Sequence, residues 1–270
     1  LRRLVLMSSE VTFPVVERFV SINGEGLRAG RLSAFIRMAG CNLACSWCDT
    51  SWANEKDCPY EELSVSDLVS WVEDTCVSCV TLTGGEPALQ QGLDTLIEAL
   101  ALSNNWGQLE VFDRNGVSQS GKSRYVKLDE KQATRVIEIE TNGSLDLSFL
   151  HDLRHSLEKR VSTPTVLAFT VDCKLPSSGM FAEMLDSNYA LLTSQDVVKF
   201  VIAGTQDLET ALAQIQKYEL PSKCEVFFSP VFSCIDPADI VSFMKAHELS
   251  TVRLQLQLHK IIWPEKDKGV

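Results

Sequence analysis

The sequence predicts an α/β fold built as a partial (incomplete) TIM-like (β/α) barrel, and three observations carry this prediction. Short apolar runs rich in Val, Ile and Phe alternate along the chain with amphipathic stretches. Such strand–helix alternation is typical of a parallel sheet. The chemically unusual residues follow directly after strands, as at the functional face of a barrel-like sheet. Because clear β/α units are too few for eight, we expect the barrel to be incomplete.

The elements follow from apolar periodicity and from helix-start signals. Ser64 or Ser66, and Asp236 before Pro237, are typical of helix N-termini. The predicted strands are Val15–Ile22, Ala34–Met38, Val77–Thr83, Arg135–Glu140, Val166–Val171, Val197–Ile202, Glu225–Ser229 and Val252–Lys260. The predicted helices are Val65–Asp74, Leu93–Ser103, Leu147–Leu157, Asp207–Tyr218 and Pro237–His247.

The chain of 270 residues is long enough for one large α/β domain, and we expect residues 1–270 to form a single domain. The exception is a polar stretch at about 104–132, which contains Asn115-Gly116 and Ser120-Gly121. Such dipeptides are typical of turns, so this stretch is predicted to be an insertion with a hairpin or loop.

Composition and charge exclude several classes of protein. With 45% hydrophobic and 23% charged residues the chain is not generally disordered. The formal net charge of −11 argues against a nucleic-acid or anionic-membrane surface, because phosphate binding needs excess Lys and Arg. No apolar run approaches the roughly 18–20 residues that cross a bilayer. Nine cysteines without an export signal predict a reducing cytoplasm, where closely spaced Cys more often bind metal than pair.

The strongest chemical signal is Cys41-Asn42-Leu43-Ala44-Cys45-Ser46-Trp47-Cys48. Three thiolates within eight residues can bind three irons of one 4Fe–4S cube and leave the fourth iron open to an exogenous ligand. A zinc knuckle with Cys58 as fourth ligand is the alternative, although zinc sites usually present two Cys-x₂-Cys pairs. Cys76 and Cys79 show only two ligands, so we expect buried structural thiols there.

Further polar residues follow apolar strands. One such segment is Thr83-Gly84-Gly85-Glu86-Pro87. Its glycines let a ligand approach the backbone, and its carboxylate can accept a hydrogen bond from an ammonium group. The alternative is an ordinary strand-to-helix turn. In Glu140-Thr141-Asn142-Gly143 a Glu ends an apolar strand, and a carboxylate there needs a partner, which indicates an inward-facing polar site. The alternative is a simple turn with Asn-Gly at its tip. The guanidinium of Arg37 matches a carboxylate.

The last predicted strand alternates Leu with polar residues. Period two places Leu254, Leu256 and Leu258 on one face and Gln255, Gln257 and His259 on the other, toward a cavity or toward water.

Taken together, these segments resemble the radical S-adenosylmethionine (SAM) superfamily and, within it, the 7-carboxy-7-deazaguanine synthase family of queuosine and 7-deazapurine biosynthesis. The superfamily is identified by the three-Cys motif, and the family by the entry segment and the C-terminal Gln-Leu-His-Lys. The resemblance covers nearly the whole chain except the insertion. It is carried by Ser21–Gly26, Phe35–Gly40, the Cys group with Asp49-Thr50, Thr83–Pro87, Glu140–Ser144, Lys174–Met180 and Gln257–Lys260.

The resemblance implies a role for each matching residue. Cys41, Cys45 and Cys48 would hold the 4Fe–4S cluster that generates the radical, and Thr50 would bind Mg²⁺, a hard cation that prefers oxygen ligands. The implied SAM contacts are Trp47, Gly85, Glu86, Glu140, Asn142, Asp172, Cys173, Lys174 and Ser177. The implied substrate contacts are Ile22, Asn23, Gly24, Glu25, Arg37, Thr83 and His259.

Two departures from the family pattern are visible. Asn23 stands where the family usually has Gln; it keeps the amide group but is shorter by one methylene. Asp172-Cys173 stands where relatives often have Ser-Pro before the Lys.

The implied activity is that of a radical SAM lyase. Cleavage of SAM by the reduced cluster would yield a 5′-deoxyadenosyl radical that starts a ring contraction. The substrate would be 6-carboxy-5,6,7,8-tetrahydropterin and the products 7-carboxy-7-deazaguanine and ammonia. We expect a cytoplasmic homodimer supplied with electrons by a flavodoxin or ferredoxin, with no nucleic-acid or membrane partner. The alternatives are a radical SAM activase acting on a partner protein and a non-catalytic metal-binding module.

Overall fold

A single nine-stranded sheet forms the framework of the molecule, in the strand order β3-β1-β2-β4-β5-β6-β7-β8-β9. The computed structural model describes residues 10–106, 135–161, 163–266 and 268–270. Neighbouring strands from β2 to β9 are parallel, whereas β1 runs antiparallel to both β2 and β3. The sheet is open, because its edges β3 and β9 do not pair with each other in the described part of the chain. The predicted partial barrel is confirmed.

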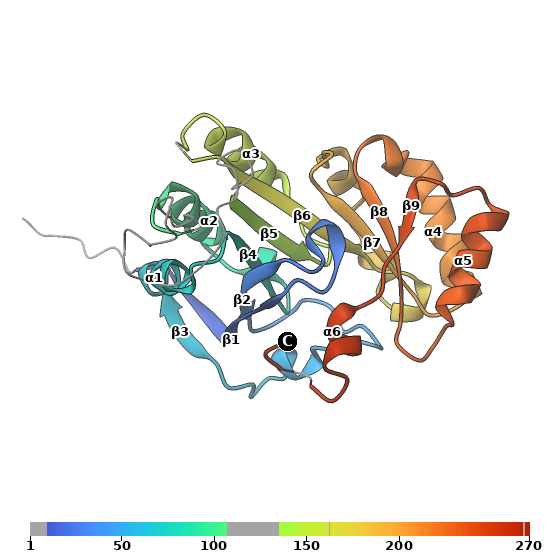
Figure 1. Cartoon of the computed structure of the whole chain (residues 1–270), viewed down its shortest axis with the longest axis horizontal. Coiled ribbons are helices and arrows are strands. Elements are labelled where there is room, and N and C mark those ends of the chain that lie inside the picture. Colours follow the sequence, from blue (N-terminus) through green and yellow to red (C-terminus); the bar gives the residue numbers. More distant parts are fainter. Residues whose placement is uncertain (1–9, 107–134, 162, 267) are drawn as a thin grey trace, which may run out of the picture.

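The strands are β1 (Thr12–Ile22), β2 (Leu32–Met38), β3 (Glu61–Ser64), β4 (Cys79–Gly84), β5 (Arg135–Thr141), β6 (Thr165–Cys173), β7 (Val197–Ile202), β8 (Glu225–Pro230) and β9 (Val252–Leu254). The helices are α1 (Val65–Thr75), α2 (Leu93–Leu102), α3 (Ser148–Leu157), α4 (Thr205–Tyr218), α5 (Pro237–Ala246) and α6 (Leu258–Ile262). Figure 1 shows α1, α2 and α3 beside the half of the sheet that holds β4 and β5, and α4 and α5 beside the half that holds β8 and β9. The short α6 lies apart from them, near the C-terminus.

The predicted elements agree with these bounds to within a few residues, with one exception. The strand expected over Val252–Lys260 is wrong, because β9 ends at Leu254 and α6 begins at Leu258. The alternation of Leu and Gln in this segment therefore does not reflect a strand with one polar face. The short strand β3 and the helix α6 were not predicted, because four or five residues carry too little periodicity.

Two other expectations concern single segments. Cys79 is buried as expected, but Cys76 is exposed at the end of α1, in a left-handed backbone conformation. Most of the predicted insertion, residues 107–132, lies outside the described residues.

Within the described residues, none of the helices combines the length and apolar character needed to span a bilayer.

Helix starts agree with their sequence signals. The Ser64 hydroxyl accepts a hydrogen bond from the backbone N–H of Asp67, and the Asp67 carboxylate accepts one from the backbone N–H of Ser64. This reciprocal capping satisfies donors that the first turn of a helix leaves free. At α5 the Asp236 carboxylate accepts from the backbone N–H of Ala238 at 2.8 Å, and Pro237 occupies the first turn.

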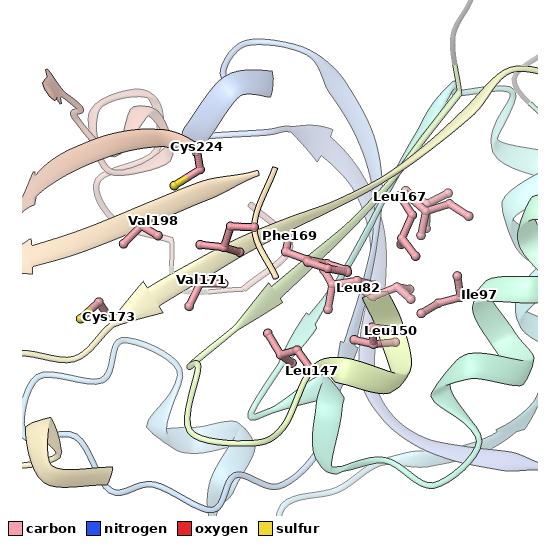
Figure 2. Close-up of a cluster of buried hydrophobic side chains, with 14 of the residues drawn as sticks. Leu82, Ile97, Leu147, Leu150, Leu167, Phe169, Val171, Cys173, Val198 and Cys224 are labelled. Carbon is pink, nitrogen blue, oxygen red and sulfur yellow. The ribbon is translucent and has the colours of Figure 1, made fainter. Parts of the chain in front are cut away.

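The core lies between the sheet and its helices. Leu82 of β4 and Phe169 of β6 are fully buried, and Figure 2 shows them beside Ile97 of α2 and Leu150 of α3. Since apolar burial is the main stabilising contribution to folding, this packing holds the strands in register. Their carboxyl ends, where the polar residues follow, are thereby held at one edge of the sheet.

A buried ion pair links α3 to the sheet. The two guanidinium ends of Arg154 donate to the Asp196 carboxylate at 2.9 and 2.6 Å, and Asp196 is fully buried before β7. The same carboxylate accepts from the backbone N–H of Phe169 at 2.7 Å, and the guanidinium lies 4.0 Å from the ring of Phe169. Arg154 and Asp196 therefore join three elements through one charge pair.

We predict that Arg154→Met destabilises the protein by about 3 kcal/mol, because removing one partner leaves a buried charge without compensation. Urea unfolding followed by circular dichroism measures this change. Arg253→Met is the control, because Arg253 pairs with Glu225 but its side chain is 55% exposed. An equal loss of unfolding free energy in both variants would show that burial of the Arg154–Asp196 pair does not set its contribution to stability.

Candidate functional site

A cavity of about 470 Å³ opens at the carboxyl ends of the parallel strands. Its size lies within the range of small-molecule sites, and its place is the one predicted for a barrel-like sheet. The cavity wall includes these residues predicted for the site: Ile22, Asn23, Gly24, Glu25, Arg37, Cys41, Cys45, Trp47, Cys48, Thr50, Thr83, Gly85, Glu140, Asn142, Asp172, Lys174 and His259. Three predicted contact residues do not line it, namely Glu86, Cys173 and Ser177.

The three predicted cluster thiols lie on one loop between β2 and the 3₁₀ turn η2 (Ser51–Asn54). The sulfur of Cys41 accepts from the backbone N–H of Leu43 at 3.4 Å and from the side-chain amide of Asn142 at 3.6 Å. Burial raises the pKa of Cys41 and of Cys45. Because metal ligation uses the thiolate, iron binding at Cys41 and Cys45 is coupled to the loss of these protons.

Close backbone contacts hold this loop against the end of β4. The backbone N–H of Gly85 donates to Met38 O at 2.9 Å, and that of Glu86 donates to Gly40 O at 2.8 Å. A Cβ atom on Gly84 would overlap the Met38 backbone, and one on Gly85 would overlap the Gly40 carbonyl group. The two glycines are therefore required by the packing of the cluster loop.

Glu86 extends this contact to β5. Its fully buried carboxylate accepts from the Thr141 hydroxyl at 2.8 Å, from the backbone N–H of Asn142 at 2.6 Å and from that of Ala88 at 2.9 Å. Burial raises the pKa of Glu86 even though these donors lower it. Glu86 joins the ends of β4 and β5 and so brings Asn142 to Cys41. The SAM contact predicted for Glu86 stays a prediction.

A second support holds the other side of the cluster loop. The hydroxyl of Ser46 donates to Ser177 O at 2.7 Å, and the indole N–H of Trp47 donates to the hydroxyl of Ser177 at 3.2 Å. Ser177 is in turn held by the buried carboxylate of Asp207, which accepts from its hydroxyl at 2.5 Å and its N–H at 3.1 Å. Ser177 thus positions the loop from outside the cavity wall.

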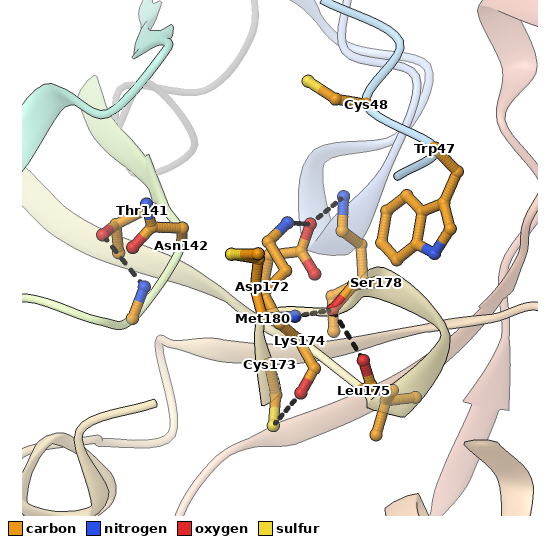
Figure 3. A network of polar contacts seen from close by, with 12 residues as sticks. Trp47, Cys48, Thr141, Asn142, Asp172, Cys173, Lys174, Leu175, Ser178 and Met180 are labelled. Carbon is orange, nitrogen blue, oxygen red and sulfur yellow. Dashed lines mark hydrogen bonds and ion pairs between the residues drawn. The ribbon is translucent and has the colours of Figure 1, made fainter. Parts of the chain in front are cut away.

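Lys174 lies on the cavity wall between an acid and an aromatic ring. Its amine is 2.9 Å from the Asp172 carboxylate and 5.3 Å from the centre of the Trp47 ring. Figure 3 shows these three residues together, with Cys48 on the same loop as Trp47. Burial by itself lowers the pKa of Lys174, but Asp172 and Cys45 raise it above its ordinary value. Cys173 points away, because its buried sulfur accepts from the Tyr189 hydroxyl at 3.0 Å.

On the far side of the cavity, the amide of Asn23 is directed into the protein. It donates to the buried carboxylate of Glu138 at 2.7 Å, and its oxygen accepts from the backbone N–H of Glu25 at 3.2 Å. Thr170 donates to the other oxygen of Glu138 at 2.8 Å. Asn23 therefore links the backbone at Glu25 to the buried carboxylate of Glu138. The sequence analysis did not identify Glu138 as part of the site.

Arg37 and His259 complete this side. The Nε of Arg37 donates to Glu17 at 2.7 Å, and Arg37 lines the cavity wall. The His259 ring packs against Gly24, where any Cβ would approach its Nδ1 within 2.6 Å. Burial lowers the pKa of His259, although Glu25 raises it. His259 lies in the first turn of α6 rather than at the end of a strand, and still reaches the cavity.

The cavity floor carries charged side chains that sequence reasoning only partly found. Lys199 of β7 lies 2.5 Å from Glu25, and Gln257 donates to the other oxygen of Glu25 at 2.7 Å. Burial, followed by the nearby Glu138, raises the pKa of Glu140 to about 7. Lys199 was missed, although a single Lys in the apolar run Val197–Ile202 signals a buried charge that needs a partner.

The predicted Mg²⁺ ligand lies next to the cluster loop. The hydroxyl of Thr50 is 3.7 Å from the sulfur of Cys48, and both line the cavity. Among the described residues, no three His, Cys, Asp or Glu side chains converge as a single metal ion would require.

The wall fits the cofactors of a radical SAM site. Three soft thiolates on one loop suit iron. The Asp172 Oδ1 atom, buried without a hydrogen-bond partner in the described part of the chain, and the Lys174 ammonium lie beside them. These groups suit a zwitterionic ligand that carries both an ammonium group and a carboxylate.

Comparison with known proteins agrees with this geometry. The family model described as the radical SAM superfamily matches residues 35–165. A 7-carboxy-7-deazaguanine synthase of Clostridium acetobutylicum is 42% identical over 260 residues, which cover 96% of this chain and 100% of that protein. One of Methanospirillum hungatei is 32% identical over 92% of this chain and 84% of that protein. The crystal structure of QueE from Escherichia coli has a TM-score of 0.60 at 19% identity, covers 91% of this chain and 94% of that one, and so supports the fold.

We predict that Gly85→Ala destabilises the protein by about 2 kcal/mol, because the new methyl group overlaps the Gly40 carbonyl group. The displaced cluster loop should also take up less iron during anaerobic reconstitution, measured as iron and sulfide per chain. Gly204→Ala is the matched control, since Gly204 is extended and its Cβ would meet nothing within 4 Å. Equal iron content in the two variants would contradict the prediction.

We predict a pH dependence of stability that comes from Glu140. Its pKa is about 7 in the folded protein and 4.5 in the reference state, so the folded state holds the proton more tightly. The contribution is full below about pH 4.5 and is lost as the pH rises through about 7, by up to about 3 kcal/mol. Urea unfolding between pH 5 and 8 should show this fall for the parent and a flatter profile for Glu140→Gln. Identical profiles would show that Glu140 does not titrate in this range.

Proposed function

The chain belongs to the 7-carboxy-7-deazaguanine synthase family of radical SAM enzymes, and on this premise we propose that it contracts the ring of 6-carboxy-5,6,7,8-tetrahydropterin to 7-carboxy-7-deazaguanine with release of ammonia. The observation that carries the proposal is the 42% identity to such a synthase across 96% of the chain. Both alternatives, an activase of a partner protein and a non-catalytic metal module, are set aside, because these relatives are named as synthases over nearly their full length.

In this proposal the cavity is divided between cofactor and substrate. When bound, the 4Fe–4S cluster and SAM would supply the radical chemistry of the reaction. Cys41, Cys45 and Cys48 would hold the cluster, and Trp47, Gly85, Asn142, Asp172 and Lys174 would contact SAM. Glu86 and Ser177 would support these contacts from behind the wall, because their side chains hold Asn142 and Trp47. Cys173 lies further away, with its sulfur bonded to Tyr189.

The substrate would occupy the opposite side of the cavity. The terminal guanidinium nitrogens of Arg37 would bind the substrate carboxylate, and Glu25 would accept from ring N–H groups. Glu140 would contact SAM. Ile22, Asn23, Gly24, Thr83 and His259 would form the rest of this wall. This wall would hold the substrate near the cofactor.

Mg²⁺ would bind through the Thr50 hydroxyl together with substrate oxygens and water, since one hydroxyl suffices when the substrate supplies further ligands. We also propose a single domain over residues 1–270, a homodimer, a flavodoxin or ferredoxin as electron donor, and a cytoplasmic location. Support for these four points comes from the sequence pattern and the family resemblance.

The function is tested by anaerobic reconstitution with iron and sulfide. Incubation with the carboxypterin, SAM, Mg²⁺ and a reductant should yield 7-carboxy-7-deazaguanine, detected by mass analysis. We predict that Cys45→Ala loses the 4Fe–4S absorption and all product, because two thiols cannot hold the cube. Cys76→Ala is the control, since Cys76 is exposed and does not line the cavity. Product from the Cys45 variant would overturn the cluster assignment.

We predict that Thr50→Val keeps the cluster and SAM binding but turns over the pterin more slowly, with a weaker response to added Mg²⁺. The change keeps the shape of the side chain and removes the oxygen that would bind the metal. Steady-state kinetics across a Mg²⁺ titration measure the effect, which falls on KM if the metal places the substrate and on kcat if it stabilises the rearrangement. An unchanged Mg²⁺ response would remove Thr50 from the metal site.

A further inference from the structure

We propose that Lys199 is a positioning residue that couples the substrate side of the cavity to the SAM side. Its ammonium group lies between Glu25, predicted to bind substrate, and Asp172, predicted to bind SAM. By holding both carboxylates it sets the distance between the two ligands. This inference rests on the proposed function and adds a residue that the sequence did not single out.

The position of Lys199 in the sheet makes this bridge possible. It lies in β7, opposite Asp172 of β6 in the strand register, so their side chains share the inner face. Its Nζ atom is 2.5 Å from Glu25 Oε2 and 3.7 Å from Asp172 Oδ2, and its side chain is only 16% exposed. Glu25 comes from the loop after β1, far from Asp172 along the chain.

The bridge continues on both sides. Toward the substrate, Gln257 donates to the second oxygen of Glu25 at 2.7 Å. Toward SAM, Lys174 donates to the same Asp172 oxygen at 2.9 Å and lies against the Trp47 ring. Asp172 keeps its other oxygen buried and without a hydrogen-bond partner in the described part of the chain, so that atom remains for a ligand.

The charges require a cation at this point. Burial by itself raises the pKa of Glu25, but Lys199 holds it below its ordinary value, so Glu25 stays ionised. Burial by itself lowers the pKa of Lys199, but Glu25, Asp172 and Glu140 together raise it well above its ordinary value. Without the ammonium group, these carboxylates would repel one another at the cavity floor and separate.

Separation of Glu25 from Asp172 would change the chemistry more than the binding. A displacement of about 1 Å at the reacting centre can lower a rate about a hundredfold. The substrate would then lie out of reach of the radical, and SAM would be cleaved without product. A residue that serves stability alone would lower the amount of active enzyme and leave the ratio of 5′-deoxyadenosine to product unchanged.

The test compares reconstituted parent enzyme, Lys199→Met, Lys199→Arg and the control Lys217→Met. Lys217 pairs with Asp186 on the surface, where its side chain is 58% exposed. Iron content and SAM binding are measured first, followed by 5′-deoxyadenosine released per 7-carboxy-7-deazaguanine formed and by KM and kcat for the pterin. We expect Lys199→Met to keep the cluster and raise that ratio about tenfold or more, Lys199→Arg to restore part of the coupling, and Lys217→Met to match the parent.

An unchanged ratio in Lys199→Met would overturn the inference, as would an equal rise in Lys217→Met. If Lys199→Met does not take up iron, Lys199→Gln is tested in its place, because the Gln amide can still donate to one carboxylate. A tenfold rise of the ratio in Lys199→Gln supports the inference, and an unchanged ratio overturns it. A parent enzyme that forms no 7-carboxy-7-deazaguanine would overturn the proposed function itself. Product from the parent with an unchanged ratio in the variant would overturn only the role of Lys199.

Discussion

The contact between the end of β4 and the cluster loop is the constraint on which the rest of the site depends. Two backbone hydrogen bonds, from Gly85 to Met38 and from Glu86 to Gly40, place the three thiols at the carboxyl end of the sheet. The contact is so close that no side chain larger than hydrogen fits at Gly84 or Gly85. Because Glu86 then bonds to the turn after β5, the strands and the loop form one rigid wall.

The wall is also an arrangement of charged side chains of both signs. Buried carboxylates normally become neutral or need partners, and both outcomes occur here. Glu140 has a raised pKa, whereas Glu25 and Asp172 stay near the ammonium group of Lys199. A site built in this way can accept from the N–H groups of a heterocycle and from an ammonium ion while keeping its own geometry.

Much of this could be predicted because the signals are local. The thiol spacing, the strand–helix alternation and the polar residues after β4, β5 and β6 indicated the fold class, the cluster loop and most of the wall. The interpretation failed at Val252–Lys260, where alternation of Leu and Gln imitates a strand although β9 ends at Leu254. There the Gln255 oxygen accepts from Gly26 N–H and Gln257 bonds to Glu25, so long-range contacts decide the backbone conformation.

The sequence by itself determined the chemistry available to the protein: three soft thiols on one short loop, carboxylates at strand ends and an Arg able to bind an anion. These depend on spacing over a few residues, which the chain carries in any fold. The tertiary structure alone decided that Lys199 would lie between Glu25 and Asp172, and that Asn23 would turn inward to Glu138. Such pairs join residues 27 to 174 positions apart, and no local pattern specifies which buried charge will face which.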